Sequence, residues 1–117
     1  MNEAYPATLR LKTRSEFLEV QKNGRRFQTD KFLVLALSRP GHPTRLGITV
    51  SRKVASAVGR NRIKRLFREA FRRGLDRWPQ GWEIVIVARR ESVGASYAQI
   101  AEALARTLGR LPTRSAA

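Results

Sequence analysis

The stretch from Arg60 to Arg73 constrains the fold most, because it sorts apolar and basic residues onto two faces of one helix. At about 100° per residue, its basic residues and Asn61 point away from its apolar residues. The apolar positions follow the i, i+3, i+4, i+7 and i+8 spacing of a stripe that faces a core: Ile63, Leu66, Phe67, Ala70 and Phe71. We expect a helix that packs this stripe on a core and ends at Gly74.

The charge of this helix predicts a polyanionic partner. Ordinary exposed helices mix signs, because opposite charges four residues apart support a helix and like charges oppose it. Glu69 is the only acid among the basic residues of the stretch, so a solvated surface helix is the weaker interpretation. A helix on a membrane surface is a further alternative, which Asn61 and Glu69 on the polar face disfavour. Nucleic-acid contact is the interpretation that the helix favours.

The basic residues of the whole chain are concentrated in one region. The 117 residues include 24 basic and 9 acidic ones, which gives a net charge of +15. Between Arg39 and Arg73 there are 11 basic residues against Glu69 alone, which indicates a nucleic-acid footprint. The length suits a single domain over residues 1–117, with an extended arm over residues 1–12 and a frayed tail over residues 110–117.

The residue types that the chain lacks exclude several functions. Without cysteine there is no disulfide or thiolate metal site, which is compatible with a reducing cytosol. No apolar run is long enough to span a bilayer, and residues 1–11 lack the apolar core of a signal peptide. The acids are scattered and His42 is the only histidine, so a metal nuclease, a histidine ribonuclease and a zinc site are all excluded. We expect a cytoplasmic protein with no membrane contact, no catalytic residue, no metal of its own and no organic cofactor.

The first half of the chain predicts one helix and one bent strand. Thr13 and Glu16 form a capping box, and the helix that follows ends at Asn23 before Gly24. A strand in two parts covers Arg25–Ser38, with a bulge or bend at its middle. Its second part is apolar on both alternating faces, which predicts a central strand that is covered on both sides.

The second half predicts two strands and two helices. Alternation over Arg45–Ser51 indicates a strand that borders solvent or a binding cleft on one face. A linker over Val54–Gly59 leads to the basic helix, whose first amides are available to phosphate. A buried strand covers Glu83–Ala88, and a last helix runs from a capping box of Ser96 and Gln99 to Gly109. The order helix, strand, strand, helix, strand, helix predicts an α+β fold with helices packed on one small sheet.

Four segments of the chain resemble one known family. The run Arg60-Asn61-Arg62-Ile63-Lys64-Arg65-Leu66 resembles the RNR signature of the protein subunit of bacterial ribonuclease P. Arg45–Lys53, Phe17 in its Ser-Glu-Phe setting, and Ile84–Arg89 before a C-terminal helix also resemble that family. The resemblance extends from about Leu9 to Leu108, and it implies a left-handed crossover through the basic helix.

The resemblance implies a partner RNA that carries the catalysis. In that family a large catalytic RNA cuts the 5′ leader from precursor tRNA with the help of the protein, and the magnesium ions act through the RNA. These two RNAs are the partners that the resemblance implies, and no obligate protein partner is evident. The residues expected to face RNA and its metal ions are Arg52, Lys53, Arg60, Asn61, Arg62, Lys64, Arg65 and Arg68, with Arg72 on the same helix face.

The resemblance also implies a cleft for the single-stranded leader between the first helix and the sheet. Its expected residues are Phe17, Gln21, Leu35 and Thr49. Gln21 and Leu35 stand where the family usually has aromatic residues. Stacking of a base on an aromatic ring is worth about 1–3 kcal/mol, so we expect a weaker grip at these two positions.

The charge excess alone leaves two other classes open. One is a ribosomal or structural RNA-binding protein, which would bind RNA without dependence on a tRNA leader. The other is a DNA-binding protein, but no helix precedes the basic helix at the short distance that a helix-turn-helix requires.

Overall fold

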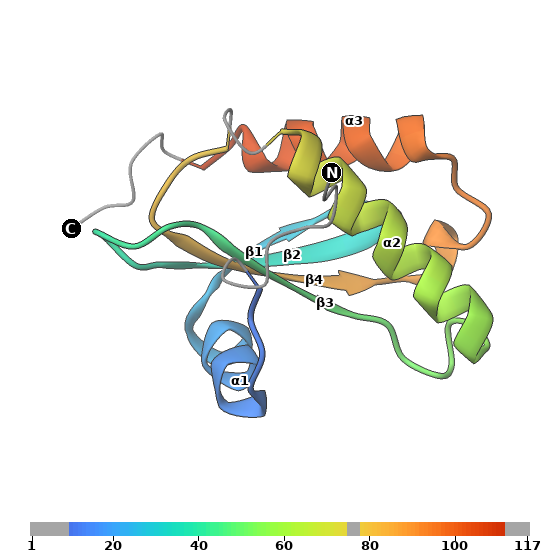
Figure 1. Cartoon of the computed structure of the whole chain (residues 1–117), viewed down its shortest axis with the longest axis horizontal. Helices are drawn as coiled ribbons and strands as arrows, with labels where there is room; N and C mark the ends of the chain where they lie inside the picture. Colours follow the sequence, from blue (N-terminus) through green and yellow to red (C-terminus); the bar gives the residue numbers. More distant parts are fainter. Residues whose placement is uncertain (1–9, 75–77, 112–117) are drawn as a thin grey trace, which may run out of the picture.

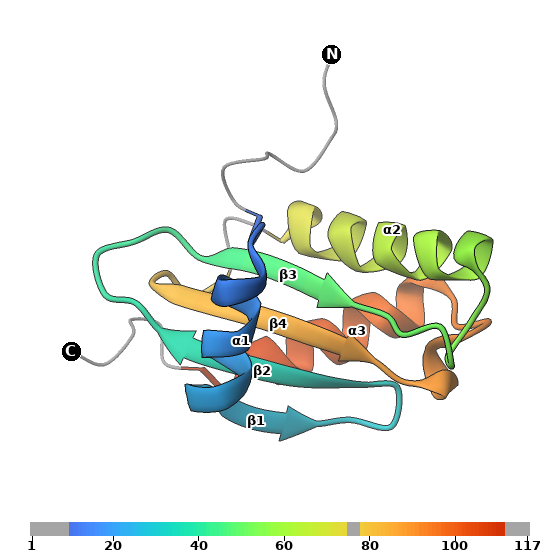
Figure 2. The same cartoon turned by 90° about the horizontal axis from the view of Figure 1, so that it is seen from below.

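A four-stranded sheet in the order β1-β2-β4-β3 separates helix α1 from helices α2 and α3 (Figures 1 and 2). The computed structural model describes residues 10–74 and 78–111. In chain order, the elements are α1 (Arg14–Asn23), β1 (Arg25–Gln28), β2 (Phe32–Ser38), β3 (Arg45–Thr49), α2 (Ala57–Arg73), β4 (Trp82–Ala88), a short 3-10 helix (Arg90–Ser92) and α3 (Tyr97–Leu108). The predicted α+β fold with helices packed on one small sheet is confirmed.

The segment predicted as one bent strand forms two strands instead. β1 pairs antiparallel to β2, with Arg25 opposite Ala36. The chain reverses at Thr29, whose hydroxyl accepts a hydrogen bond from the amide of Phe32 at 3.0 Å and donates one to the carbonyl of Phe32 at 2.9 Å. A threonine side chain that bonds its neighbouring backbone favours a turn over a continuous ladder. The element order is therefore helix, strand, strand, strand, helix, strand, helix.

Both predicted capping boxes are confirmed. The amide of Glu16 donates to Thr13 Oγ1 at 3.1 Å, and the amide of Thr13 donates to Glu16 Oε1 at 3.1 Å. Ser96 and Gln99 exchange the same pair of bonds at the start of α3. Hydrogen bonds from the amides of Lys12 and Thr13 lower the pKa of Glu16 to about 2. The start of α1 is therefore tied to the end of the segment before it.

Helix α2 begins earlier than its charge pattern predicts. Ser56 is its N-cap, and its hydroxyl accepts a hydrogen bond from the amide of Gly59 at 3.4 Å. The expected linker over Val54–Gly59 thus contributes its last three residues to the helix. A serine cap stabilises a helix by about 1 kcal/mol, which offsets the low helix propensity of one glycine.

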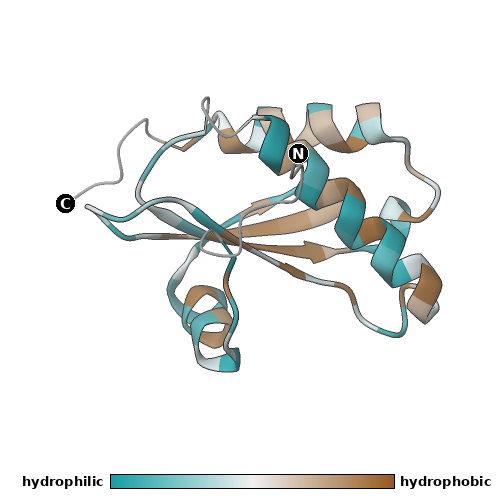
Figure 3. Cartoon of the chain, viewed as in Figure 1, coloured by the Kyte–Doolittle hydropathy of each residue, from teal (hydrophilic) through white to brown (hydrophobic). Residues whose placement is uncertain are grey.

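The core has two parts, one on each side of the sheet. The larger part lies under α2 and α3, where the rings of Phe32 and Phe67 meet edge to face at 5.0 Å. The smaller part lies under α1 and comprises Leu11, Val20, Leu35 and Val85. Figure 3 shows brown strands between the helices and teal along the outer side of α2. The predicted apolar stripe of α2 is confirmed, because Ile63, Phe67, Ala70 and Phe71 are buried.

The chain passes from β3 to β4 by a left-handed crossover, as the resemblance implies. β3 and β4 are parallel, with Arg45 opposite Glu83. In Figure 2, which looks from the side of α1, both strands point the same way and β4 lies below β3, with α2 on the far side of the sheet. The general rule favours right-handed crossovers in roughly 98% of cases, so topology rules alone predict the wrong hand.

The described end of the predicted arm lies beside β3. The amide of Leu11 donates to the carbonyl of Leu46 at 3.0 Å, and Arg10 forms a parallel bridge with Leu46. The rest of the arm, residues 1–9, lies outside the described residues, as do residues 75–77 and most of the predicted tail, residues 112–117. Within residues 10–74 and 78–111, no helix is long and apolar enough to cross a membrane.

Candidate nucleic-acid interface

The first two-thirds of α2 presents most of the residues predicted to face RNA. Asn61, Arg62 and Arg65 are exposed, and Lys64 and Arg68 are half-buried. Arg60 and Arg62 use part of their donor capacity on backbone carbonyls, those of Ala55 at 3.0 Å and Ala95 at 3.5 Å. Neither bond involves a carboxylate, so these two hydrogen bonds do not compensate the positive charge of Arg60 and Arg62.

Positive charge is compensated at the end of α2. Both Arg72 and Arg73 pair with Glu69, whose Oε2 lies 2.7 Å from Arg72 Nη2 and 2.7 Å from Arg73 Nε. These hydrogen bonds lower the pKa of Glu69 to about 2. The guanidinium of Arg73 also lies 5.1 Å from the ring centre of Tyr97. Arg72, the last of the predicted RNA contacts on α2, therefore has an acidic partner on its own helix.

A groove of about 210 Å³ lies between α1, β3 and α2. Lys64 and Arg68 of α2 line one side of it, and Phe17 of α1 lines the other. The structure thus brings together residues that the sequence assigns to two separate RNA sites. The remaining lining residues come from the segment before α1 and from β3: Arg10, Leu11, Lys12, Leu46, Gly47 and Ile48.

Gly47 fixes the place of the Phe17 ring in this groove. A Cβ atom at position 47 would lie 2.5 Å from Cζ of Phe17, closer than real Cβ contacts come. The ring therefore rests directly on the backbone of β3 and is half-buried there. Phe17 packs against the small core under α1 and also lines the groove, so the one ring contributes to both.

The sheet face beneath α1 carries three rows of side chains that cross the strands, and two of them concern the cleft. The covered row consists of Arg26, Leu35, Val85 and Gly47, and the open row consists of Gln28, Leu33, Val87 and Thr49. Leu35 is 2% exposed beneath α1, whereas Leu33, Val87 and Thr49 are half-buried. Of the two sheet residues predicted for the cleft, Thr49 lies in the open row and Leu35 lies in the covered row.

Helix α1 forms a wall beside the open row. Glu16 and Glu19 face the opposite side, where they pair with Arg45 and Arg39. Phe17 is turned about 100° from Glu16 around the helix axis, and Gln21 follows Phe17 on the same face. Gln21 is exposed, at the position where the resemblance places it. The sequence did not single out Leu33 and Val87, because only the strand register shows which alternate residues α1 leaves open.

Arg52 and Lys53 lie in the turn between β3 and α2, where both are exposed. Only Val50 and Ser51 separate this turn from Thr49, so its positive charge lies near the end of the open row. Two residues predicted to face RNA and one residue predicted for the cleft therefore lie near the same end of β3.

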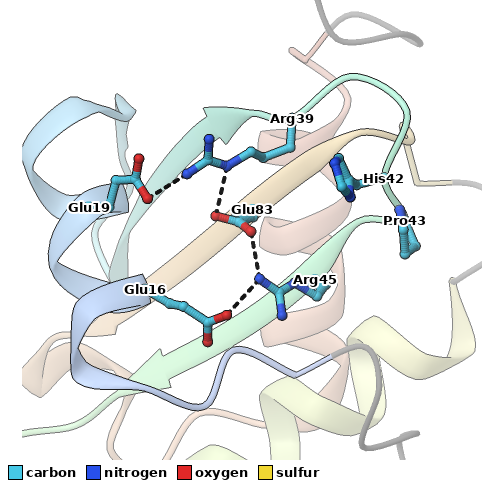
Figure 4. Close-up of a pocket in the computed structure, with 7 residues that line it drawn as sticks. All are labelled: Glu16, Glu19, Arg39, His42, Pro43, Arg45 and Glu83. Atoms are coloured by element: carbon cyan, nitrogen blue, oxygen red, sulfur yellow. Dashed lines mark hydrogen bonds and ion pairs between the residues drawn. The ribbon is translucent and has the colours of Figure 1, made fainter.

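A second hollow, of about 550 Å³, lies on the other side of α1 (Figure 4). A chain of ion pairs runs across it in the order Glu19, Arg39, Glu83, Arg45, Glu16. The closest contacts of Glu83 are 2.6 Å to Arg45 Nη2 and 3.3 Å to Arg39 Nε. The hydrogen bond with Glu19 raises the pKa of Arg39, and that with Glu83 raises the pKa of Arg45. Each arginine is thus already paired with carboxylates.

His42 lies at the edge of this second hollow, in a turn. In the described ranges, no group of three or more histidine or acidic side chains could hold a metal ion. Figure 4 shows the His42 ring apart from the ion-pair chain.

The fold and this surface define a small α+β protein with a cationic crossover helix beside an edge strand. The sequence model of the family described as Ribonuclease P matches residues 5–112. The chain is 43% identical over 110 residues to the ribonuclease P protein component of Desulfovibrio desulfuricans, covering 91% of this chain and 85% of that protein.

Two solved structures share the fold. The RNase P protein from Thermotoga maritima has a TM-score of 0.81 at 34% identity, over 88% of this chain and 97% of that one. A Staphylococcus aureus RNase P protein, described as a mutant with defective mRNA degradation activity, has a TM-score of 0.79 at 30% identity, over 87% of this chain and 86% of that one. The chain belongs to the ribonuclease P protein family, whose members are components of a tRNA-processing ribonucleoprotein.

Proposed function

We propose that this protein binds the catalytic RNA of ribonuclease P through α2 and holds the 5′ leader of precursor tRNA beside α1, so that the RNA removes the leader. The observation that carries the proposal is the groove in which Phe17 of α1 meets Lys64 and Arg68 of α2. A single strand of RNA needs both an apolar surface for its bases and cations for its phosphates. This groove offers both within one hollow.

The open row extends this surface for the leader. Leu33 and Val87 are half-buried apolar side chains that pack partly on the small core. Bases can lie on such a floor with Phe17 and Gln21 as a wall. Because Leu33 and Val87 lack rings, we expect contact of bases with this floor to be weaker than aromatic stacking.

The division of labour between protein and RNA is part of the same proposal. The chain supplies positive charge and positions the substrate, and the catalytic RNA supplies the reacting groups with its magnesium ions. The cations of α2 screen phosphates that would otherwise repel each other when leader and catalytic RNA come together. We place this assembly in the cytoplasm, where tRNA is processed in cells without a nucleus.

The test is reconstitution with the catalytic RNA. At low magnesium concentration, addition of the protein should restore cleavage of precursor tRNA at the 5′ end of the mature sequence. The complex should bind precursor tRNA more tightly than mature tRNA. Equal affinity for both would contradict leader binding and favour a structural RNA-binding protein.

A control is needed for cleavage by the protein alone, because the Staphylococcus aureus relative is described in connection with mRNA degradation. We expect highly purified protein without the catalytic RNA to bind RNA and cut neither precursor tRNA nor mRNA. Cleavage activity that copurifies with the protein and is lost when one of the protein's own side chains is replaced would contradict the proposal that the RNA carries the catalysis.

A further inference from the structure

We propose that Arg26 binds a phosphate of the leader at the far end of the cleft, on strand β1, and so sets how many leader nucleotides the protein contacts. This inference rests on the proposed leader binding and adds a site that the family signature in α2 does not include.

The register places Arg26 on the face of the sheet that α1 covers. Arg26 pairs with Leu35, and Leu35 belongs to the core under α1. Its neighbour Phe27 packs against the other core, under α2 and α3. Because successive side chains of a strand point to opposite faces, Arg26 lies on the cleft side.

Arg26 stands at the end of the covered row and beside the end of the open row. Gln28, two residues further along β1, begins the open row next to Leu33. Helix α1 crosses the strands from β3 toward β1, as Figure 2 shows, and Gly24 at its end packs closely on the backbone of Ala36. A leader that enters at Thr49 and follows α1 therefore reaches β1 after three strand spacings, about 14–15 Å.

The charge of Arg26 is available to such a phosphate. Arg26 is exposed, and in residues 10–74 and 78–111 no carboxylate forms an ion pair with it. Arg39 and Arg45, on the other side of α1, are both paired. The side of α1 that carries the open row thus ends at an uncompensated guanidinium, while the other side ends in ion pairs.

Arg25 provides a matched control on the same strand. It is also exposed, but it pairs with Ala36 and its guanidinium lies 5.8 Å from the ring centre of Phe27. Arg25 therefore belongs to the opposite face of the sheet. The two neighbouring arginines contribute equally to net charge and differ in the face on which they lie.

The experiment measures affinity of the reconstituted complex for precursor tRNAs whose leaders are lengthened one nucleotide at a time. With the wild-type protein, affinity should rise with leader length and then reach a plateau. Arg26→Gln should reach its plateau at a shorter leader, with a several-fold weaker final affinity. The salt slope for the long leader should fall by about 0.7, the value for one phosphate contact on a single strand. Arg25→Gln should retain the wild-type length dependence, and Arg26→Lys should restore most of the loss.

Equal effects of Arg25→Gln and Arg26→Gln would mean that affinity depends on the net charge of the protein and not on the position of Arg26. That result would overturn the inference. A loss in Arg26→Gln that is the same for mature tRNA, or that appears in binding to the catalytic RNA alone, would place Arg26 against that RNA and overturn it as well. If Arg26→Gln shows the same dependence of affinity on leader length as the wild type, the inference is overturned. The proposed leader binding is then unaffected. If wild-type protein shows no preference for any leader, the proposed function fails too.

Discussion

The two faces of the sheet differ in how far their charged side chains are paired within the chain. On the α2 side, the cations of the first two-thirds of the helix have no carboxylate counterpart on that helix, because its single acid, Glu69, is engaged by Arg72 and Arg73 at the end. On the α1 side, three carboxylates alternate with two arginines in a continuous chain of ion pairs. Within residues 10–74 and 78–111, Arg60, Arg62 and Arg65 thus form no ion pair with a carboxylate, whereas Arg39 and Arg45 do.

The largest expected effect concerns the cations of α2. Replacing both Arg65 and Arg68 with alanine should weaken binding to the catalytic RNA by roughly 100-fold at 0.1 M salt, since each phosphate contact accounts for about one unit of salt slope. The slope should fall by about 2. Titrations at several salt concentrations measure both quantities. An unchanged slope would mean that these side chains do not touch phosphate.

Phe17→Ala tests the groove to which both α1 and α2 contribute side chains. Loss of the ring should reduce the preference for precursor over mature tRNA by about 1–3 kcal/mol, the range for stacking on an aromatic side chain, with little change in salt slope. A purely structural role would instead cost roughly 3–5 kcal/mol of stability and impair all activities together. Melting temperature and leader preference, measured on the same preparation, separate these results. A large loss of stability with unchanged leader preference would end the cleft assignment.

Glu83→Gln and Glu69→Gln compare the two kinds of ion pair directly. Glu83 is 8% exposed and joins Arg39 to Arg45, so its loss should cost about 1–3 kcal/mol of stability by leaving two guanidinium groups short of a partner. Glu69 lies at the surface, where such pairs contribute about 0–1 kcal/mol. Glu69→Gln should therefore leave stability nearly unchanged and, by releasing Arg72 and Arg73, tighten RNA binding. Denaturant unfolding of both variants checks the order of the two effects, and a reversed order would contradict the comparison.

The last expected effect is a dependence of stability on pH in the acid range. The pKa of Glu16 is lowered from 4.5 to about 2, so folding is favoured by its ionised form above pH 4.5. This contribution should be lost as pH falls from about 4.5 toward 2, because the unfolded chain binds the proton first. Glu16→Gln should be less stable than the wild type at neutral pH and should lose less stability over that acid range. Parallel pH dependences of the two proteins would show that Glu16 contributes nothing there.

The sequence predicted elements best where local chemistry decides them. The capping boxes at Thr13 and Ser96 and the apolar stripe of α2 depend on residues three or four apart, and all are confirmed. The turn at Thr29 was predicted as a bend, because a run of apolar residues does not show whether its two parts pair with each other. The hand of the crossover came from the family resemblance, since general topology rules favour the other hand.

The candidate site was predictable in its residues more than in its arrangement. The α2 residues follow from the signature, and their exposure agrees with the helical spacing. The contact of Phe17 with Gly47 and the open row of Leu33 and Val87 depend on strand register and on where α1 crosses the sheet. Neither is fixed by residues close together in sequence. The pairing of Glu69 with Arg72 could have been predicted from the sequence, because the two residues are three positions apart on one helix.

The parallel pairing of β3 with β4 has a consequence for the folding reaction. The hairpin of β1 and β2 joins residues close in sequence, but Arg45 and Glu83 are 38 positions apart. Contacts between distant residues form slowly, because the chain between them loses entropy before the contact is made. We therefore expect β3 to join the sheet late, with α2 already helical. The groove beside Phe17 then exists only in the last stage, so RNA that binds it selects fully folded molecules and draws the folding equilibrium toward them.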